Sequence, residues 1–141
     1  MSYLLDTNVC AVLINGPDGR DAFPQVRGRF ARLRASGIRS AISSIVVHEL
    51  WSGVAKSIRL QANTKRLLEF LSSRFELVDF SPEDARVAGE VRADLERKGA
   101  RIGEYDTLIA GQALARGLTL VTANTREFSR VNGLKLEDWT Q

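Results

Sequence analysis

The stretch that decides the fold is residues 2–14, SYLLDTNVCAVLI. Residues 3–6 are typical of a short buried strand, and a helix follows that Thr7 or Asn8 can cap. Asp6 therefore stands between an apolar strand and an apolar helix. An ionised carboxylate in such surroundings needs a partner, so Asp6 is the first candidate for a functional residue.

The rest of the chain alternates short apolar segments with amphipathic ones. Further strands are expected at 39–43, 76–80, 118–122 and 134–136, and helices at 23–34, 44–54, 60–74, 82–98 and 104–117, with a loop at 15–19. Ser44 and Ser81 are the expected helix caps. This order predicts an α/β fold, a mainly parallel sheet flanked by helices in three layers, within a single domain over residues 1–141.

Composition narrows the class of protein. The chain has 141 residues, a net charge of +3 and one cysteine, Cys10, so it forms no internal disulfide, which fits the reducing cytoplasm. No signal peptide or membrane-spanning run is recognisable. Arginine outnumbers lysine by 16 to 4; this bias suits phosphate binding but equally reflects a GC-rich genome.

Three carboxylates are flanked by apolar sequence: Asp6, Glu49 and Asp106. Each alone has an ordinary explanation, as a helix cap, an exposed helix residue or a favourable charge at a helix N-terminus. In a parallel sheet, however, ligands bind at the carboxyl ends of strands, where Thr122 and Asn124 also lie. A divalent cation would keep such neighbouring carboxylates ionised, and oxygen ligands favour Mg²⁺ or Mn²⁺ over zinc.

Four blocks of sequence carry a resemblance to a known family. They are LLDTNVC, VVHELWSG, GEYDTLIAGQALARGLTLVTANTREF and VNGLKLEDW, in that order along essentially the whole chain. Together they resemble PIN-domain ribonucleases, and more closely the VapC toxins of bacterial type II toxin–antitoxin modules. The resemblance implies a PIN-like fold and an Mg²⁺-dependent endoribonuclease, with Mn²⁺ as a substitute.

The resemblance assigns roles residue by residue. Asp6 in DTN, Glu49 in HELWSG and Asp106 in GEYDTLIA match three acids that hold the metal. At the fourth position, Asn124 takes the place of an Asp found in many relatives. That departure removes one negative charge and puts the strength of the metal site in doubt.

Another acid can compensate for Asn124. Glu90 is the preferred candidate, because toxins of the enteric type have an acid at that place; its ordinary reading is a solvated helix face. Glu127 in TREF is the second candidate. The expected catalytic set is therefore Asp6, Glu49, Asp106 and Glu90.

Other residues have expected supporting roles. Asp6 and Asp106 are the expected direct metal ligands, whereas Glu49 acts through water or positions the nucleophile. The residues expected to orient them are Thr7, Asn8, Thr122 and Asn124. Those expected to contact the RNA backbone are Arg101, Arg126 and Arg130, for which a plain surface role is the alternative.

The resemblance also implies partners. VapC-like toxins are neutralised by a VapB antitoxin, usually dimerise, and bind operator DNA through the antitoxin. The helices expected at 23–34 and 60–74 are candidate surfaces, although core packing explains their apolar stripes equally well. The RNA target is left open, with initiator tRNA cut in its anticodon stem-loop as the leading candidate.

Three other classes of protein share some of these features. A receiver domain would have an adjacent acidic pair early in the chain, and a haloacid-type phosphatase would have Asp-x-Asp where this chain has Asp6-Thr7-Asn8. A catalytically silent binding module stays open because of Asn124. His48 neighbours Glu49 but points about 100° away on a helix, and Ser43-Ser44 lacks a nucleophile elbow, so neither indicates catalysis.

Overall fold

A five-stranded sheet forms the centre of the molecule. The computed structural model describes residues 2–15, 23–73 and 75–141. The sheet has the order β3-β2-β1-β4-β5, and each of its neighbouring pairs is parallel. Its strands are β1 (Tyr3–Leu5), β2 (Ser40–Ser43), β3 (Phe75–Val78), β4 (Thr119–Val121) and β5 (Leu136–Glu137). The predicted α/β class is confirmed, and the sheet goes beyond "mainly parallel", since every described pairing is parallel.

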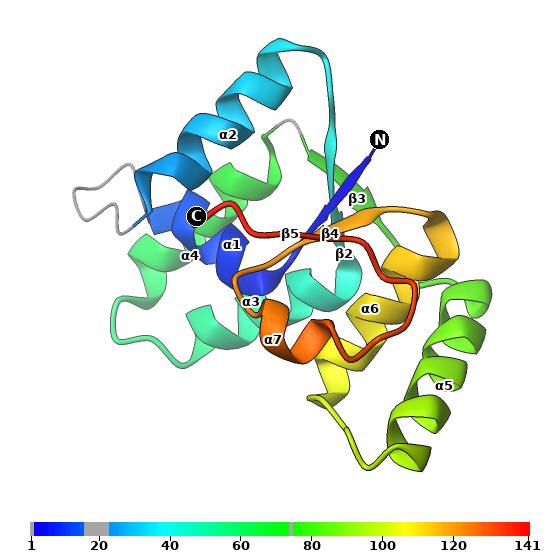
Figure 1. The fold of residues 1–141 in the computed structure, drawn as a ribbon. Coiled ribbons are helices and arrows are strands. Elements are labelled where there is room, and N and C mark those ends of the chain that lie inside the picture. The colour runs from blue at the N-terminus through cyan, green and yellow to red at the C-terminus, as the bar shows by residue number, and fades with distance from the viewer. Residues whose placement is uncertain (1, 16–22, 74) are drawn as a thin grey trace.

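Helices cover both faces of this sheet. They are α1 (Thr7–Asn15), α2 (Pro24–Ala35), α3 (Ser44–Ala55), α4 (Leu60–Leu71), α5 (Pro82–Arg97), α6 (Glu104–Arg116) and α7 (Thr125–Phe128). Figure 1 shows α1, α2 and α4 on one side of the strands and α5 and α6 on the other. Helix α3 contacts both α4 and α6. Within the described ranges, none of these helices combines the length and apolar character needed to cross a membrane.

The helix starts differ from the expected ones in two places. The carbonyl of Asp6 accepts from the amide of Cys10, so Asp6 itself precedes the first turn of α1 and neither Thr7 nor Asn8 caps it. In α3 the capping hydroxyl belongs to Ser43, which accepts from Ile45 N, rather than to Ser44. The cap of α1 lies earlier because β1 ends at Leu5, one residue before its expected end. Strand β2 ends at Ser43 as expected, and this last strand residue itself caps α3.

Two further differences concern the length and number of helices. The helix expected over 60–74 ends at Leu71, and residue 74 lies outside the described residues. Most of the loop expected at 15–19 also lies outside them. The four-residue helix α7 was not predicted, because so short a helix has no apolar periodicity.

Helices α5 and α6 are held together by close packing and a buried charge. Gly111 of α6 touches α5 so closely that an added Cβ would lie 2.4 Å from Cα of Ala88. Asp84, 1% exposed, completes the capping box of α5 with Ser81. Its Oδ2 also accepts from Gln112 Nε2 at 3.1 Å and from Arg116 Nη2 at 3.0 Å. These contacts fix the position of α6, which carries Asp106.

Candidate active site

The site lies where β1 and β4 end side by side. Both strands are parallel, and the amide of Asp6 continues their pairing by donating to the carbonyl of Val121 at 3.0 Å. Asp6 follows β1 and Thr122 follows β4, so two residues far apart in the sequence meet at the same edge of the sheet. This is the edge at which ligands bind in parallel α/β folds.

Asp6 is held by hydrogen bonds to both of its carboxylate oxygens. Thr122 Oγ1 donates to Oδ2 at 2.8 Å, and the amide of Thr7 donates to Oδ1 at 2.8 Å. Asp6 is only 4% exposed. Burial raises the pKa of Asp6 above its usual value, although both hydrogen bonds act in the opposite direction. A cation beside this carboxylate would remove the cost of keeping it ionised.

Glu49 is tied to the same end of the sheet from α3. Thr7 Oγ1 donates to Glu49 Oε1 at 2.8 Å. Thr7 therefore binds two carboxylates, Asp6 through its amide and Glu49 through its hydroxyl. The predicted supporting role of Thr7 thus has a specific geometry, in which one residue fixes the relative position of two acids.

Asp106 completes the group from the first turn of α6. Burial, followed by the negative charges of Asp6, Glu49 and Glu127, raises the pKa of Asp106 to about 6. These four residues are called the acidic cluster below. Carboxylates that repel one another in a partly buried site are typical of a cation-binding site.

Glu127 enters the acidic cluster through Asn124. The amide of Asn124 donates to Thr122 Oγ1 at 2.9 Å, and its side-chain Nδ2 donates to Glu127 Oε2 at 3.0 Å. Asn124 thus brings no negative charge of its own but orients a carboxylate three residues later. Residues 124–127, Asn-Thr-Arg-Glu, follow a strand and have the Asn-x-x-Glu spacing of a helix start with an acid in its first turn. This spacing is the sequence signal that favours Glu127.

Glu90 is not brought to the acidic cluster. It is exposed on α5, where its Oε2 forms an ion pair with Arg86 Nη1 at 2.8 Å, and it is not among the charges that raise the pKa of Asp106. The structure therefore favours its ordinary reading as a solvated helix residue. The preference for Glu90 over Glu127 rests on the resemblance to toxins of the enteric type, and a sequence does not show which face of a helix is exposed.

The remaining candidate residues are exposed on the elements that carry the acidic cluster or next to them. Asn8 is exposed on α1, and His48 is exposed on α3 with its Nε2 3.4 Å from Tyr105 Oη. Arg126 is exposed on α7, beside Glu127. Arg130 Nη1 donates to the carbonyl of Arg101 at 3.1 Å, which links the segment after α7 to the loop before α6.

The donors of the acidic cluster fit a hard divalent cation. In the described part of the chain, no three acidic, histidine or cysteine side chains are gathered tightly enough to ligate one ion by themselves. Mg²⁺ characteristically takes one or two carboxylates and keeps several waters. Asp6 and Asp106 are the carboxylates that would hold such an ion directly, and Glu49 and Glu127 are the ones that would act through its waters.

Comparison with known proteins gives a consistent family. The PIN domain model matches residues 3–134. Ribonuclease VapC2 of Rickettsia felis is 44% identical over 139 residues, which are 99% of this chain and 98% of the relative. The tRNA(fMet)-specific endonuclease VapC of Salmonella typhimurium is 41% identical over 140 residues, again 99% and 98% of the two chains.

Solved structures agree with the sequence relatives. The VapBC2 complex of Rickettsia felis, bound to a DNA fragment from its promoter, contains a chain that matches with a TM-score of 0.87 and 42% identity over 99% of both chains. The DNA-bound VapBC of Salmonella typhimurium matches with a TM-score of 0.85 and 39% identity, over 99% of this chain and 98% of the other. With its fold, its acidic cluster and these relatives, the chain belongs to the PIN-domain family, in the group of the VapC ribonucleases.

Proposed function

We propose that this protein is an endoribonuclease of the VapC type that uses Mg²⁺, or Mn²⁺ in its place, to hydrolyse phosphodiester bonds in RNA. The observation that carries the proposal is the acidic cluster, in which mutual repulsion and burial raise the pKa of Asp106 to about 6. Folding has brought four carboxylates close enough to raise this pKa, and a bound cation would relieve the repulsion between them. The names of the ribonuclease relatives support the choice of RNA.

The protein's own residues prepare this chemistry. A bound divalent ion supplies Lewis-acid polarisation of the phosphate and a water of lowered pKa. Asp6 is held ready to ligate by Thr122 and Thr7. Glu49, positioned by the Thr7 hydroxyl, can accept a proton from the attacking water, and Glu127 is turned toward the same place by Asn124. Because folding already orients these side chains, little conformational entropy is lost when RNA binds.

For the substrate we infer a tRNA, with initiator tRNA cut in the anticodon stem-loop as the leading candidate. One relative is named as specific for tRNA(fMet), and it matches over 99% of this chain. Loops offer unstacked bases and flexible phosphates, which RNA-binding proteins recognise most readily. The exposed guanidinium groups of Arg126 and Arg130 are suited to the flanking phosphates.

The experiment that tests this function is cleavage of total bacterial tRNA by the purified chain, free of antitoxin. It is run with Mg²⁺, with Mn²⁺ and with EDTA, and with Asp106→Asn in parallel. A discrete cut that needs metal and is lost in Asp106→Asn supports the proposal. If a folded chain binds Mn²⁺ but cuts no tRNA, the choice of tRNA is wrong; if it binds no Mn²⁺, the chain is a silent binding module.

We further propose that a VapB-like antitoxin neutralises this chain. The related solved structures are VapBC complexes, two of them with DNA. An apolar groove of about 280 Å³ lies between α1, α3 and α4, and Thr7 and Glu49 form part of its wall. An antitoxin segment in this groove would adjoin the acidic cluster and block it. Of the two expected partner helices, α4 contributes to the groove through Leu67, whereas α2 does not line it.

The proposal extends to assembly and location. We propose a toxin dimer whose antitoxin, rather than the toxin itself, contacts operator DNA, and a cytoplasmic site of action, where tRNA is present. The buried, unpaired Cys10 suits a reducing compartment. Light scattering of the chain with and without its antitoxin measures the assembly directly; a monomer in both states would contradict the dimer.

A further inference from the structure

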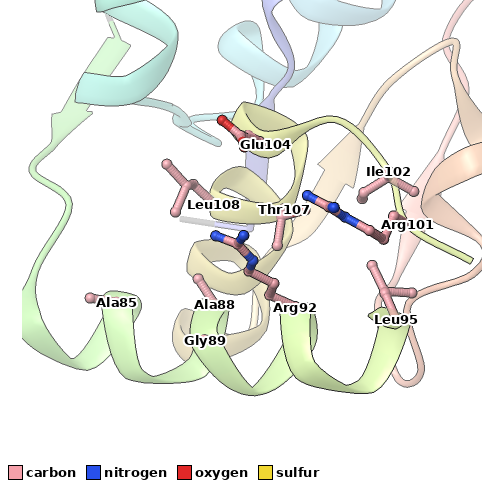
Figure 2. Close-up of a pocket in the computed structure, with 10 residues that line it drawn as sticks. All are labelled: Ala85, Ala88, Gly89, Arg92, Leu95, Arg101, Ile102, Glu104, Thr107 and Leu108. Atoms are coloured by element: carbon pink, nitrogen blue, oxygen red, sulfur yellow. The ribbon is translucent and has the colours of Figure 1, made fainter. Parts of the chain in front are cut away.

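A second pocket lies on the side of α6 that faces away from the acidic cluster. It has a volume of about 290 Å³ and lies between α5, the first turns of α6 and the residues just before α6 (Figure 2). Glu104, Thr107 and Leu108 line it, and their spacing places them on one face of α6. Asp106 lies between them in sequence and faces the other way, toward Asp6.

The floor of this pocket is apolar and well packed. It is formed by Ala88, Leu95, Ile102 and Leu108, of which the first three are at most 8% exposed. Thr107 adds no free hydroxyl, since its Oγ1 donates to the carbonyl of Gly103 at 3.0 Å. The floor therefore suits a flat apolar group rather than water or a hydrogen-bonding side chain.

Two guanidinium groups reach over this floor. Arg92 comes from α5 and Arg101 from the loop before α6, and Figure 2 shows both directed into the pocket over α6. The Arg92 side chain forms an exposed ion pair with Glu96, in which Nε and Oε2 are 3.6 Å apart. Within the described residues, no hydrogen bond or ion pair involves the guanidinium of Arg101. Glu104, at the rim, points its carboxylate away from both arginines.

We propose that this pocket binds one unstacked nucleotide of the RNA substrate, with its phosphate between Arg92 and Arg101 and its base against the apolar floor. This inference rests on the proposed function. The planar donor forks of arginine match phosphate oxygens, and aromatic bases bury well against apolar side chains. The volume is at the lower end of that of small-molecule sites, as expected for a single nucleotide.

The pocket and the acidic cluster lie at positions that one RNA strand can contact together. The acidic cluster and the pocket are separated by the first turn of α6, a distance of about one helix diameter, roughly 10–12 Å. A single strand that crosses the N-terminus of α6 can place one phosphate at the acidic cluster and a neighbouring nucleotide in the pocket. The pocket would then select RNA in which a base near the cut is free to leave its stack, as in a loop.

The test measures RNA affinity as a function of length. Fluorescently labelled oligouridylates, from a dinucleotide to a decanucleotide, are titrated with the full-length chain in EDTA, and binding is followed by anisotropy. The variants are Arg92→Gln, which removes one charge, and Gly89→Leu, which fills the pocket without a charge change; a Cβ at Gly89 meets no atom within 4 Å. Arg97→Gln, on the same helix but outside the pocket, is the control of matched charge.

The expected result is a gain in wild-type affinity with length that both pocket variants lose. Arg92→Gln and Gly89→Leu weaken binding of the long probe about 5- to 20-fold relative to the dinucleotide, whereas Arg97→Gln weakens it less than twofold. Arg92→Gln also lowers the slope of log affinity against log salt by about one. Circular dichroism and thermal unfolding confirm that each variant is folded.

Three results would overturn the nucleotide site. Equal losses in Arg92→Gln and Arg97→Gln would show a general surface charge effect, and wild-type affinity in Gly89→Leu would show that the pocket stays empty. A change of oligomeric mass in the variants would show that the pocket is instead a contact between copies of the chain. Failure of the proposed function is separate: the wild-type chain would then cut no RNA with Mn²⁺, whatever its binding in EDTA.

Discussion

Thr122 Oγ1 donates a hydrogen bond of 2.8 Å to Asp6 Oδ2 across 116 residues of sequence. Thr122 is fully buried and Asp6 is 4% exposed, so this bond joins the ends of β4 and β1 where water is excluded. It stabilises the charged form of a carboxylate whose pKa is raised by burial. The ionised state of Asp6 is therefore supported by a neighbour that carries no charge itself.

Thr122→Val tests this role. The change keeps the shape of the side chain but removes the hydroxyl that donates to Asp6 and accepts from the amide of Asn124. The pKa of Asp6 is therefore expected to rise further and the apparent Mn²⁺ affinity to fall about tenfold. A lost hydrogen bond to a charged group corresponds to about 1.5–3 kcal/mol. Isothermal titration with Mn²⁺ measures the affinity. Thr119→Val, on the same strand but away from Asp6, is the control; equal losses in both variants would contradict a specific role for Thr122.

The raised pKa of Asp106 predicts a dependence of stability on pH. Because the folded-state pKa, about 6, exceeds the ordinary value of 3.8, Asp106 favours folding below pH 4, and this contribution is lost as the pH rises through 6. The half-buried position of Asp106 limits the effect to about 1 kcal/mol at neutral pH. Urea unfolding in EDTA at pH 4 to 8 measures it, with Asp106→Asn, which lacks the titration, as reference.

The wild-type chain and Asp106→Asn also distinguish a cation-binding site from mere repulsion between carboxylates. Added Mn²⁺ is expected to restore the stability of the wild-type chain at pH 7.5 and to leave Asp106→Asn nearly unchanged, since ligand binding stabilises only a fold that binds it. Parallel pH curves for the two proteins, or equal stabilisation by Mn²⁺, would remove Asp106 from the proposed site.

Glu127 and Glu90 offer a matched pair of substitutions. Glu127→Gln removes a charge that raises the pKa of Asp106, so the acid limb of the pH–rate profile is expected to move to lower pH and cleavage at limiting Mn²⁺ to fall about tenfold. Glu90→Gln removes an equal charge at an exposed position paired with Arg86, and its rate is expected to stay within twofold of the wild type. The opposite order of effects would return Glu90 to the catalytic set.

Gly111→Ala probes the packing that positions α6. The added methyl group would lie 2.4–2.6 Å from backbone and side-chain atoms of Ala88, so α5 and α6 must move apart. We expect a loss of about 1–3 kcal/mol in the free energy of unfolding, as for other overpacked cores. Gly53→Ala is the control: it lies in helix α3, its Cβ meets no atom within 4 Å, and it is expected to stabilise by about 0.5–1 kcal/mol. Chemical denaturation that finds the two variants alike would contradict the tight α5–α6 contact.

The sequence by itself determined the order of the strands and of the described helices other than α7, and three members of the acidic cluster. Apolar periodicity and cap residues are local signals, so the helix start at Ser81 and the end of α6 at Gly117 could be predicted from the sequence. Asp6, Glu49 and Asp106 were found because each interrupts an apolar segment, and because parallel strands present their carboxyl ends at one edge.

The tertiary structure alone decided which fourth carboxylate joins them and which groups hold them. Glu90 and Glu127 are both acids on helices, and only the packing of α5 against α6 and of α7 against β5 turns one to solvent and the other toward Asp106. The hydrogen bond of Thr122 to Asp6 and the pocket between α5 and α6 likewise join distant segments. Local sequence specifies the conformation of a segment, whereas the direction of a side chain toward a partner depends on how the segments pack.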